Sequence, residues 1–530
     1  MDRRDALRLL SIPAFAPALG AFEFGSLRTP GANPPAGPPD VELKLVAAPA
    51  EVTLRPGAPT RVWRYTAEVV RGPASTVQSI PGSYLGPTLR FRRGQKVRVR
   101  FENRLPEPSI VHWHGLDVPE AADGHPRLAV EGGGEYVYDF EVVNRAGTYW
   151  YHPHPHMRTG AQVYQGLAGV ILVSDPEDDA LGLPAGDAEL VLVLQDRRLD
   201  ANNQLVYAPG GAMSGMGRRG GMGMGGGMGG DMARMMETMN GWLGDRPFVS
   251  GAHQPTRTVE RRPYRLRLLN GSNARIYKLA WSDQHPFTIL GSDGGLLERA
   301  RTRPALTLAP GQRADVLLDC AARQSGSTFS LRSLAYPAAA VGRVGMMGDT
   351  SPLPQGAALE LMRFAVAGGP GRTLRLPDRL STPPEAWTVR GDAPVRRVSL
   401  TFMRMEWLIA GRTFDLDEVA ADETVAAGST HIWELRNEPN PMGMAMAHPI
   451  HVHGTQFRVL SRAGADDNAL GDGLSDTSAT DTVLVRPGET VRVQITFSRY
   501  PGLYLYHCHV LEHEDMGMMR NFRITSPVRP

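Results

Sequence analysis

The segment Gly502-Leu-Tyr-Leu-Tyr-His507-Cys508-His509 is the main clue to the fold, because a segment identical at five of its eight positions, Gly147-Thr-Tyr-Trp-Tyr-His152-Pro-His154, occurs much earlier in the chain. A third segment, Gly326-Ser-Thr-Phe-Ser-Leu-Arg332, resembles both but contains no histidine. Their β-branched and aromatic residues between turn signals are typical of β-strands. An internal repeat of this kind indicates one structural unit that occurs three times.

A second repeated element supports this interpretation. A turn of glycine and a polar residue precedes an alternating strand at Gly94-Gln95, Gly311-Gln312, Gly428-Ser429 and Gly488-Glu489. The predicted fold class is therefore all-β, with three related β-sandwich domains at residues 42–178, 188–367 and 385–527. Pro-containing linkers at 174–186 and 368–384 separate them.

The composition excludes several classes of protein. The chain has 530 residues and a formal net charge of +2, which argues against a nucleic-acid-binding protein with a concentrated basic face. Its 2 cysteines rule out a disulfide framework. Beyond the N-terminus no run of about 18 apolar residues suggests a membrane span.

The N-terminus has the features of an export signal. Arg3 and Arg4 precede a short apolar run that extends to about residue 21. This pattern predicts a twin-arginine (Tat-type) signal and linker over residues 1–30, recognised by the Tat machinery, and a location in the periplasm or outside the cell. The alternative is a disordered basic start.

Ten of the 15 histidines lie in four short blocks, which begin at His112, His152, His448 and His507. In a strand, residues i and i+2 point to the same face, so each His-x-His pair can direct two imidazoles at one metal cluster. Cys508, between His507 and His509, would then point to the opposite face. A thiolate with imidazoles and a weak axial Met is the ligand set of a blue-copper electron-transfer site. A closed zinc site needs only about four ligands and fits this set poorly.

Two motifs carry a resemblance to a known family. They are His507-Cys-His-Val-Leu-Glu-His513-Glu-Asp-Met-Gly-Met-Met519 and His448-Pro-Ile-His-Val-His-Gly-Thr-Gln-Phe457. With the other two blocks, they resemble the multicopper oxidases, in particular the bacterial copper-efflux oxidases and bacterial laccases. The resemblance implies cupredoxin-like Greek-key sandwiches and an oxidase that passes single electrons to O₂.

The resemblance also implies a set of four copper ions and their ligands. Type 1 copper would take His448, Cys508, His513 and the axial Met518; type 2 copper His112 and His451; one type 3 copper His114, His152 and His509; the other His154, His453 and His507. Family members also place acids near the cluster to supply protons, and Asp123 and Glu514 match those positions. The alternative for Asp123 is an acid in a solvated loop, and the alternative for Glu514 is a salt-bridged acid at the end of a strand.

Methionine is the compositional anomaly, because nine of the 22 lie between Met213 and Met239. The Gly-rich residues 211–230 predict an exposed loop. Met232, Met235, Met236 and Met239 follow at helical spacing, which places four thioethers on one helix face. Thioethers favour Cu(I), so residues 211–240, together with Met444 and Met446, are a candidate site for additional Cu(I). The alternative is an amphipathic helix that covers an apolar patch.

Two departures from copper-efflux oxidases concern this substrate site. Those proteins usually carry the Met-rich insert in the third domain, whereas here it lies in the second. Met444 also occupies a position where they tend to have an acid. We expect a monomeric laccase or cuprous oxidase whose partners are O₂ and Cu(I), other reduced metal ions or small phenols. The rival hypothesis is a copper-sequestering protein in which the Met-rich segment is the main function.

Overall fold

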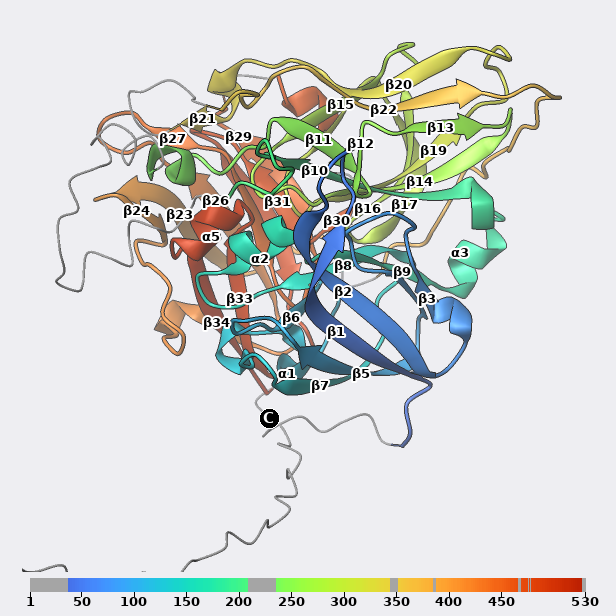
Figure 1. Ribbon diagram of the computed structural model, residues 1–530. Helices are drawn as coiled ribbons and strands as arrows, with labels where there is room; N and C mark the ends of the chain where they lie inside the picture. The colour runs from blue at the N-terminus through green and yellow to red at the C-terminus, as the bar shows by residue number, and fades with distance from the viewer. Residues whose placement is uncertain are drawn as a thin grey trace, which may run out of the picture.

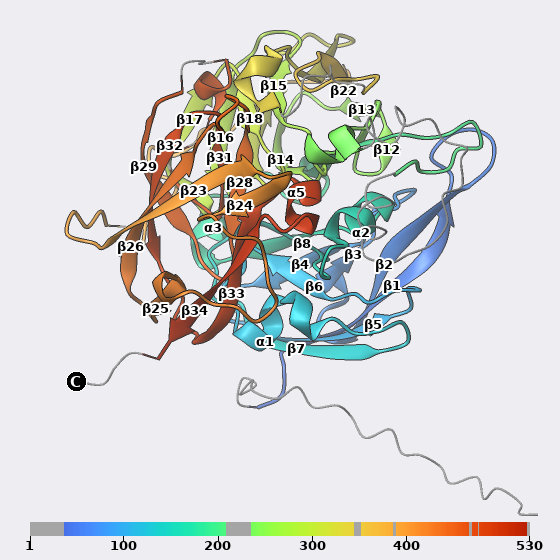
Figure 2. The same cartoon turned by 90° about the vertical axis from the view of Figure 1, so that its left-hand side faces the viewer.

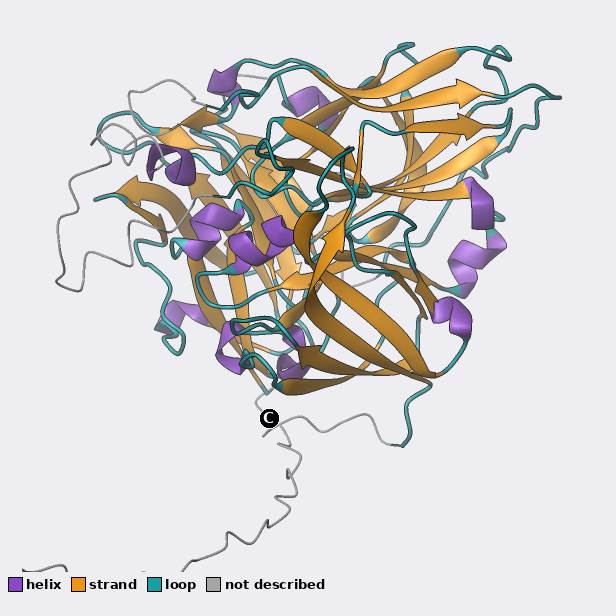
Figure 3. Ribbon diagram, in the orientation of Figure 1, coloured by secondary structure: helices purple, strands orange, loops and turns teal. Residues whose placement is uncertain are grey.

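The computed structural model describes residues 37–207, 235–343, 351–384, 388–465, 469–474, 476 and 478–526. Two parts of the sequence analysis lie outside these residues. They are the predicted export signal and residues 211–234 of the Met-rich segment, which include Met232. Three pairs of sheets follow one another along the chain, coloured blue to cyan, green to yellow and orange to red in Figure 1. Strands are the dominant secondary structure, and the helices between them are short (Figure 3).

The first sandwich consists of a four-stranded and a five-stranded sheet. Their strand orders are β2-β1-β5-β7 and β3-β4-β9-β8-β6, formed by β1 (Val41–Val52), β2 (Thr60–Arg71), β3 (Val77–Gln78), β4 (Thr88–Arg92), β5 (Lys96–Asn103), β6 (Val111–His114), β7 (Glu135–Glu141), β8 (Gly147–Pro153) and β9 (Gly169–Ser174). In the first half of β1 every second residue is buried, because one face of this strand packs on the core and the other faces outward.

The second sandwich consists of a seven-stranded and a five-stranded sheet. The seven-stranded order is β12 (Ala252–His253), β11 (Arg246–Val249), β10 (Glu189–Arg197), β14 (Pro263–Asn270), β19 (Arg313–Asp319), β16 (Phe287–Ser292) and β17 (Gly295–Arg303). The five-stranded order is β13 (Thr256–Val259), β22 (Leu359–Val366), β20 (Thr328–Ser333), β15 (Tyr277–Trp281) and β18 (Leu306–Leu308). Cys320 is buried in its core, so it behaves as a small apolar side chain.

The third sandwich consists of a six-stranded and a five-stranded sheet. The six-stranded order is β24 (Glu406–Ile409), β23 (Val395–Met403), β26 (Thr430–Asn437), β32 (Thr490–Thr496), β29 (Phe457–Ala463) and β30 (Ala479–Thr480). The five-stranded order is β25 (Thr424–Ala426), β34 (Met519–Thr525), β33 (Gly502–Cys508), β28 (His448–Val452) and β31 (Thr482–Val485). A short pair, β21 (Gly342–Arg343) and β27 (Ala445–Met446), joins the second and third sandwiches.

The three sandwiches share one topology, which confirms the predicted fold class. In each, the first strand pairs in parallel with a later one: β1 with β5, β10 with β14, and β23 with β26. The three repeated segments of the sequence form β8, β20 and β33, which occupy equivalent places in their sheets.

The strands that carry histidines differ from the alternating strands. Every residue of β6, β8 and β28 is buried, because one face packs on the core and the other on a neighbouring sandwich. Helix α2 (Thr159–Gln165) of the first sandwich lies beside α5 (Leu511–Asp515) of the third (Figure 2). The amide groups of Thr159 and Gly160 donate to the Asp515 carboxylate at 2.8 and 2.9 Å, so this contact fixes the two sandwiches together. Within the described residues, no helix is long and apolar enough to cross a membrane.

Candidate metal centres

Cys508, His448 and His513 form one buried cluster. We call these three residues and Met518 the Cys508 site. Cys508 ends β33, and His448 begins the neighbouring strand β28. His513 lies in α5, one turn after Cys508. The Cys508 Sγ lies 3.5 Å from His448 Nδ1 and 3.6 Å from His513 Nδ1. Met518 is fully buried in the same core, and its carbonyl accepts a hydrogen bond from the Cys508 amide at 3.0 Å.

The surroundings of the Cys508 site orient its imidazoles. His513 Nε2 donates to the carbonyl of Met239 at 3.0 Å, which leaves its Nδ1 facing the sulfur. The Trp407 ring lies 4.9 Å from the His448 ring and 4.3 Å from the His513 ring. Burial raises the pKa of the Cys508 thiol, so a thiolate here requires a cation beside it. A soft metal ion bound to sulfur and two imidazoles meets that requirement.

The other eight predicted ligands meet between the first and third sandwiches, and we call them the histidine cluster. They are His112, His114, His152, His154, His451, His453, His507 and His509. The Nε2 atoms of His112 and His451 lie 3.3 Å apart. His507 Nε2 lies 3.1 Å from His453 Nε2 and 3.4 Å from His154 Nε2. Nitrogens of three histidines therefore converge at His507, as one metal ion would require.

The nitrogens of the histidine cluster fit metal ligation. Burial lowers the pKa of His152 to about 3 and that of His154 to about 4, which keeps these imidazoles in the neutral form that binds metals. Buried nitrogens of His114, His152 and His509 have no hydrogen-bond partner. Each such atom costs about 1–3 kcal/mol if it stays unsatisfied. A metal ion would satisfy these nitrogens together, so the donor set fits the copper cluster that the resemblance implies.

Asp123 and Glu514 both lie inside the histidine cluster rather than in solvent. Asp123 ends α1 (Glu120–Asp123), and its Oδ2 accepts from His453 Nδ1 at 2.8 Å. Glu514, in α5, places Oε2 3.1 Å from His507 Nδ1 and Oε1 3.4 Å from His154 Nε2. Burial raises the pKa of Asp123. Burial would also raise the pKa of Glu514, but the neighbouring imidazoles outweigh it and hold this pKa below its usual range.

The described methionines of the candidate substrate site pack in or against the core of the third sandwich, which also contains the Cys508 site. Met239 is buried in the core that contains Cys508 and Met518, and Met235, Met236 and Met444 are half-buried against that core. Residues 235–239 are helical. Met446, in β27, is buried in the same core. The thioethers therefore cover this core, and Met239 packs within it as the amphipathic-helix alternative describes.

Three residues at these centres were missed by sequence reasoning. Asp481 Oδ1 lies 3.0 Å from His114 Nε2, and Arg313 forms an ion pair with Asp481. Trp407 packs on both histidines of the Cys508 site. None belongs to a His-containing block, and the only signal near Arg313 was the turn at Gly311 that precedes a strand.

Comparisons with known proteins agree with this arrangement. Two family models, both described as multicopper oxidase, match residues 62–178 and 391–528. The chain is 30% identical to the multicopper oxidase mco of Staphylococcus haemolyticus over 84% of this chain and 83% of that protein. It is 29% identical to a laccase of Bacillus subtilis over 88% of this chain and 91% of the relative.

A solved structure is similar over nearly the whole chain. The McoA multicopper oxidase of Aquifex aeolicus is 32% identical and superimposes with a TM-score of 0.74, over 92% of this chain and 97% of that one. These likenesses extend across both the Cys508 site and the histidine cluster. The chain therefore belongs to the multicopper oxidase family and is an oxidoreductase.

Proposed function

We propose that this multicopper oxidase is exported by the twin-arginine route and oxidises Cu(I), small phenols or both at the Cys508 site. The electrons would then reduce O₂ to water at the histidine cluster. The observation that carries the proposal is that one short segment joins the two centres. Cys508 lies between His507 and His509 at the end of β33. Its thiol meets His448 and His513, whereas His507 meets His154 and His453.

This layout provides a short covalent path between the two centres. Copper bound in these ligand sets would supply one-electron acceptance at the Cys508 site and O₂ binding at the histidine cluster. The chain contributes the connection, because the backbone of one tripeptide joins the two sets of ligands. Burial of every ligand keeps bulk water away from both centres.

The reduction of O₂ to water consumes protons as well as electrons, and two carboxyl groups are placed to hold them. Asp123 receives a hydrogen bond from His453, and Glu514 contacts His507 and His154. Groups within hydrogen-bond reach of a reacting centre can transfer protons: Asp123, whose pKa burial raises, can hold a proton, and Glu514, whose pKa the imidazoles lower, can accept a proton and pass it on. We assign this role to Asp123 and Glu514.

The methionines around the Cys508 site support Cu(I) as a substrate. Met235 and Met236 are half-buried against the core that contains the Cys508 site. Met239, one turn later in the same helix, accepts a hydrogen bond from His513 Nε2 through its carbonyl. A Cu(I) ion bound by these thioethers would lie close to the site of electron entry. The laccase among the relatives supports phenols as an alternative substrate.

Replacing Met235 and Met236 together by leucine tests the substrate proposal. Leucine keeps the apolar volume, so the helix still packs, but the soft sulfur ligands are lost. We expect Cu(I)-dependent O₂ uptake to fall by roughly tenfold or more, because two thioethers are lost and even the outer partners of metal ligands commonly contribute about 10–100-fold to affinity or activity. Uptake with a small phenol should stay the same or rise. The substitutions spare Met239, whose carbonyl orients His513.

A matched control is Met362→Leu, which alters a buried methionine in the core of the second sandwich. It should leave uptake with Cu(I), Fe(II), Mn(II) and the phenol unchanged. Equal Cu(I) turnover in the double variant and the native protein would contradict the role of these thioethers. If copper-loaded protein consumed no O₂ with any reductant, copper sequestration would replace oxidation as the proposed function.

A further inference from the structure

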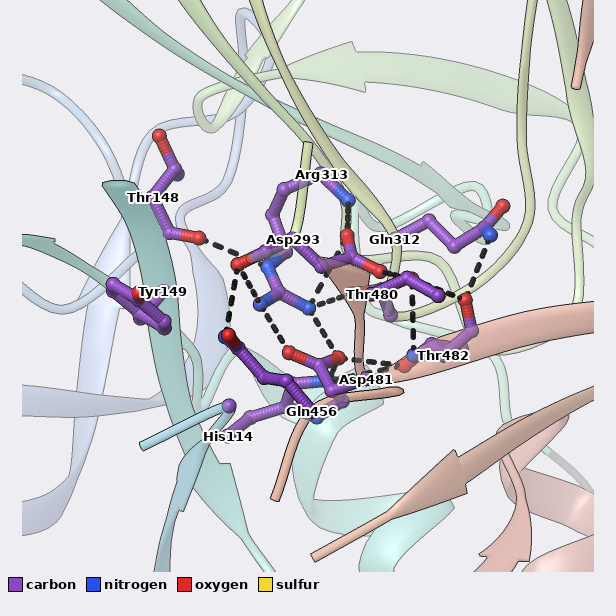
Figure 4. A network of polar contacts seen from close by, with 12 residues as sticks. His114, Thr148, Tyr149, Asp293, Gln312, Arg313, Gln456, Thr480, Asp481 and Thr482 are labelled. Carbon is purple, nitrogen blue, oxygen red and sulfur yellow. Dashed lines mark hydrogen bonds and ion pairs between the residues drawn. The ribbon is translucent and has the colours of Figure 1, made fainter. Parts of the chain in front are cut away.

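Arg313 is a buried arginine of the second sandwich whose side chain extends toward the histidine cluster (Figure 4). It begins β19, directly after the turn at Gly311 and Gln312. The second sandwich supplies none of the ligands predicted for the four copper ions. A charged side chain that reaches from it to the seam between the other two sandwiches therefore needs an explanation.

All five N–H groups of the Arg313 guanidinium can be matched to acceptors, and these come from all three sandwiches. Nε donates to the carbonyl of Thr148 in β8 at 3.0 Å. Nη1 and Nη2 donate to the carbonyls of Gly311 and Asp293 at 3.0 and 3.2 Å. They also form a bidentate pair with the two Asp481 carboxylate oxygens at 2.7 and 2.6 Å. A planar guanidinium has no further donors, so its orientation is fully determined.

Asp481 connects Arg313 to two predicted copper ligands. Its Oδ1 accepts from His114 Nε2 at 3.0 Å, and its backbone carbonyl accepts from His451 Nδ1 at 2.8 Å. Each bond fixes which ring nitrogen carries the proton. The free nitrogens are then Nδ1 of His114, which is buried without a partner, and Nε2 of His451, which faces His112.

The residues around Arg313 and Asp481 are closely packed, so neither side chain has room to adopt another position. A side chain at Gly115, the residue after His114, would place its Cβ 2.6 Å from Asp481 Oδ2 and 2.7 Å from Arg313 Nη2. A Cβ at Gly311 would lie 2.9 Å from the His509 ring. The turn before Arg313 therefore packs directly on the His509 ring. In the same turn, Gln312 Nε2 donates to the Thr482 carbonyl at 2.9 Å.

We propose that Arg313 is a positioning residue for the histidine cluster, which acts through Asp481 to set the ring nitrogens that His114 and His451 present to copper. The second sandwich thereby takes part in building a metal centre to which it gives no ligand. Outer partners that orient metal-bound imidazoles commonly change metal affinity about 10–100-fold when they are removed. The inference rests on the assignment of the histidine cluster to copper, not on the identity of the reducing substrate.

The alternative is that Arg313 only joins the sandwiches by a buried ion pair. Arg265 provides the matched control, because it is also buried in the second sandwich and pairs with Asp315 and Asp178 at 2.6 and 2.7 Å. Neither of these two partners of Arg265 is a predicted copper ligand. A variant at each arginine therefore separates the loss of a buried ion pair from the loss of the link to Asp481.

The test uses the full-length protein with Arg313→Met, Arg313→Lys and Arg265→Met. Copper per chain is measured by elemental analysis after reconstitution, and the resting protein is examined by electron paramagnetic resonance and visible absorption. We expect Arg313→Met to lose or alter the type 2 copper signal and to bind less copper, while the blue absorption of the Cys508 site remains. Arg313→Lys keeps the charge but not the bidentate geometry, so it should show the same defect in a weaker form. Arg265→Met should keep the native signals.

Because Arg313→Met leaves the Asp481 charge unpaired, the double variant Arg313→Met/Asp481→Asn is included. It removes the unpaired charge and should fold, with the same defect in the type 2 signal. Native copper content and an unaltered type 2 signal in Arg313→Met or in the double variant would overturn the proposal. So would an equal loss in Arg265→Met. These readings need no reducing substrate, so an error in the substrate proposal would leave them unchanged.

Discussion

Replacing Cys508 by serine should abolish the blue absorption and reduce O₂ uptake with every reductant. The expected loss exceeds the roughly 10–100-fold that removal of an outer partner causes at metal sites, because a direct ligand is removed. Serine fills nearly the same space between His448 and His513, so the fold should persist. Its hydroxyl is a hard, weakly acidic donor that cannot replace a thiolate. Visible absorption, copper analysis and O₂ uptake measure these effects.

Cys320→Ser is the control for this prediction, because Cys320 is the other cysteine of the chain and is also buried. It lies in the core of the second sandwich, away from the predicted ligands. We expect Cys320→Ser to keep the blue absorption and native turnover, at some cost in stability. A Cys508→Ser protein that stayed blue and active would show that electrons do not enter at the Cys508 site.

Replacing Glu514 by glutamine should slow O₂ reduction while electron entry continues. Glutamine keeps the shape of the side chain beside His507 and His154, but its amide cannot transfer a proton as a carboxyl group does. Loss of a group that transfers protons in this way typically costs about 10²–10⁴-fold. We expect a loss in that range for steady-state O₂ uptake, with native rates when substrate reduces the Cys508 site without O₂. Stopped-flow bleaching of the blue absorption separates the two steps.

The carboxyl of Glu512, two residues before Glu514, provides a control on the same helix. Glu512 is equally buried, but it accepts hydrogen bonds from the Tyr207 hydroxyl and the Asn273 amide at 3.0 and 2.9 Å. These partners lie outside the histidine cluster, so Glu512→Gln should change uptake far less than Glu514→Gln. Equal losses in the two variants, or a Glu514→Gln protein slowed only in substrate reduction, would contradict the proton role.

Local patterns were enough to predict the fold and to single out histidines that the structure brings together. The repeated segments that end at His154 and His509 predicted equivalent strands, and they form β8 and β33. The two-residue period of a strand predicted that Cys508 and His507 point in opposite directions. In the structure Cys508 meets His448 and His513, while His507 meets His154 and His453. Such geometry follows from spacing because the strand itself enforces it.

The residues that orient the ligands could not be predicted in this way. Arg313 and Asp481 lie in different sandwiches, and their pairing depends on how those sandwiches pack. Trp407 reaches His448 and His513 for the same reason. The methionines show another limit, because a helical stripe of apolar residues has one pattern whether it binds copper or packs on a core. Met239 lies in that core, while Met235 and Met236 remain candidates for Cu(I).

The number of electrons consumed per O₂ tests whether the Cys508 site and the histidine cluster work as one oxidase. The copper-loaded protein is supplied with a limiting, known amount of a one-electron reductant, and both O₂ consumption and hydrogen peroxide are measured. If the Cys508 site and the histidine cluster work as one oxidase, each O₂ will consume four electrons and no peroxide will accumulate. Two electrons per O₂ with stoichiometric peroxide would contradict the claim that the histidine cluster completes the reduction to water.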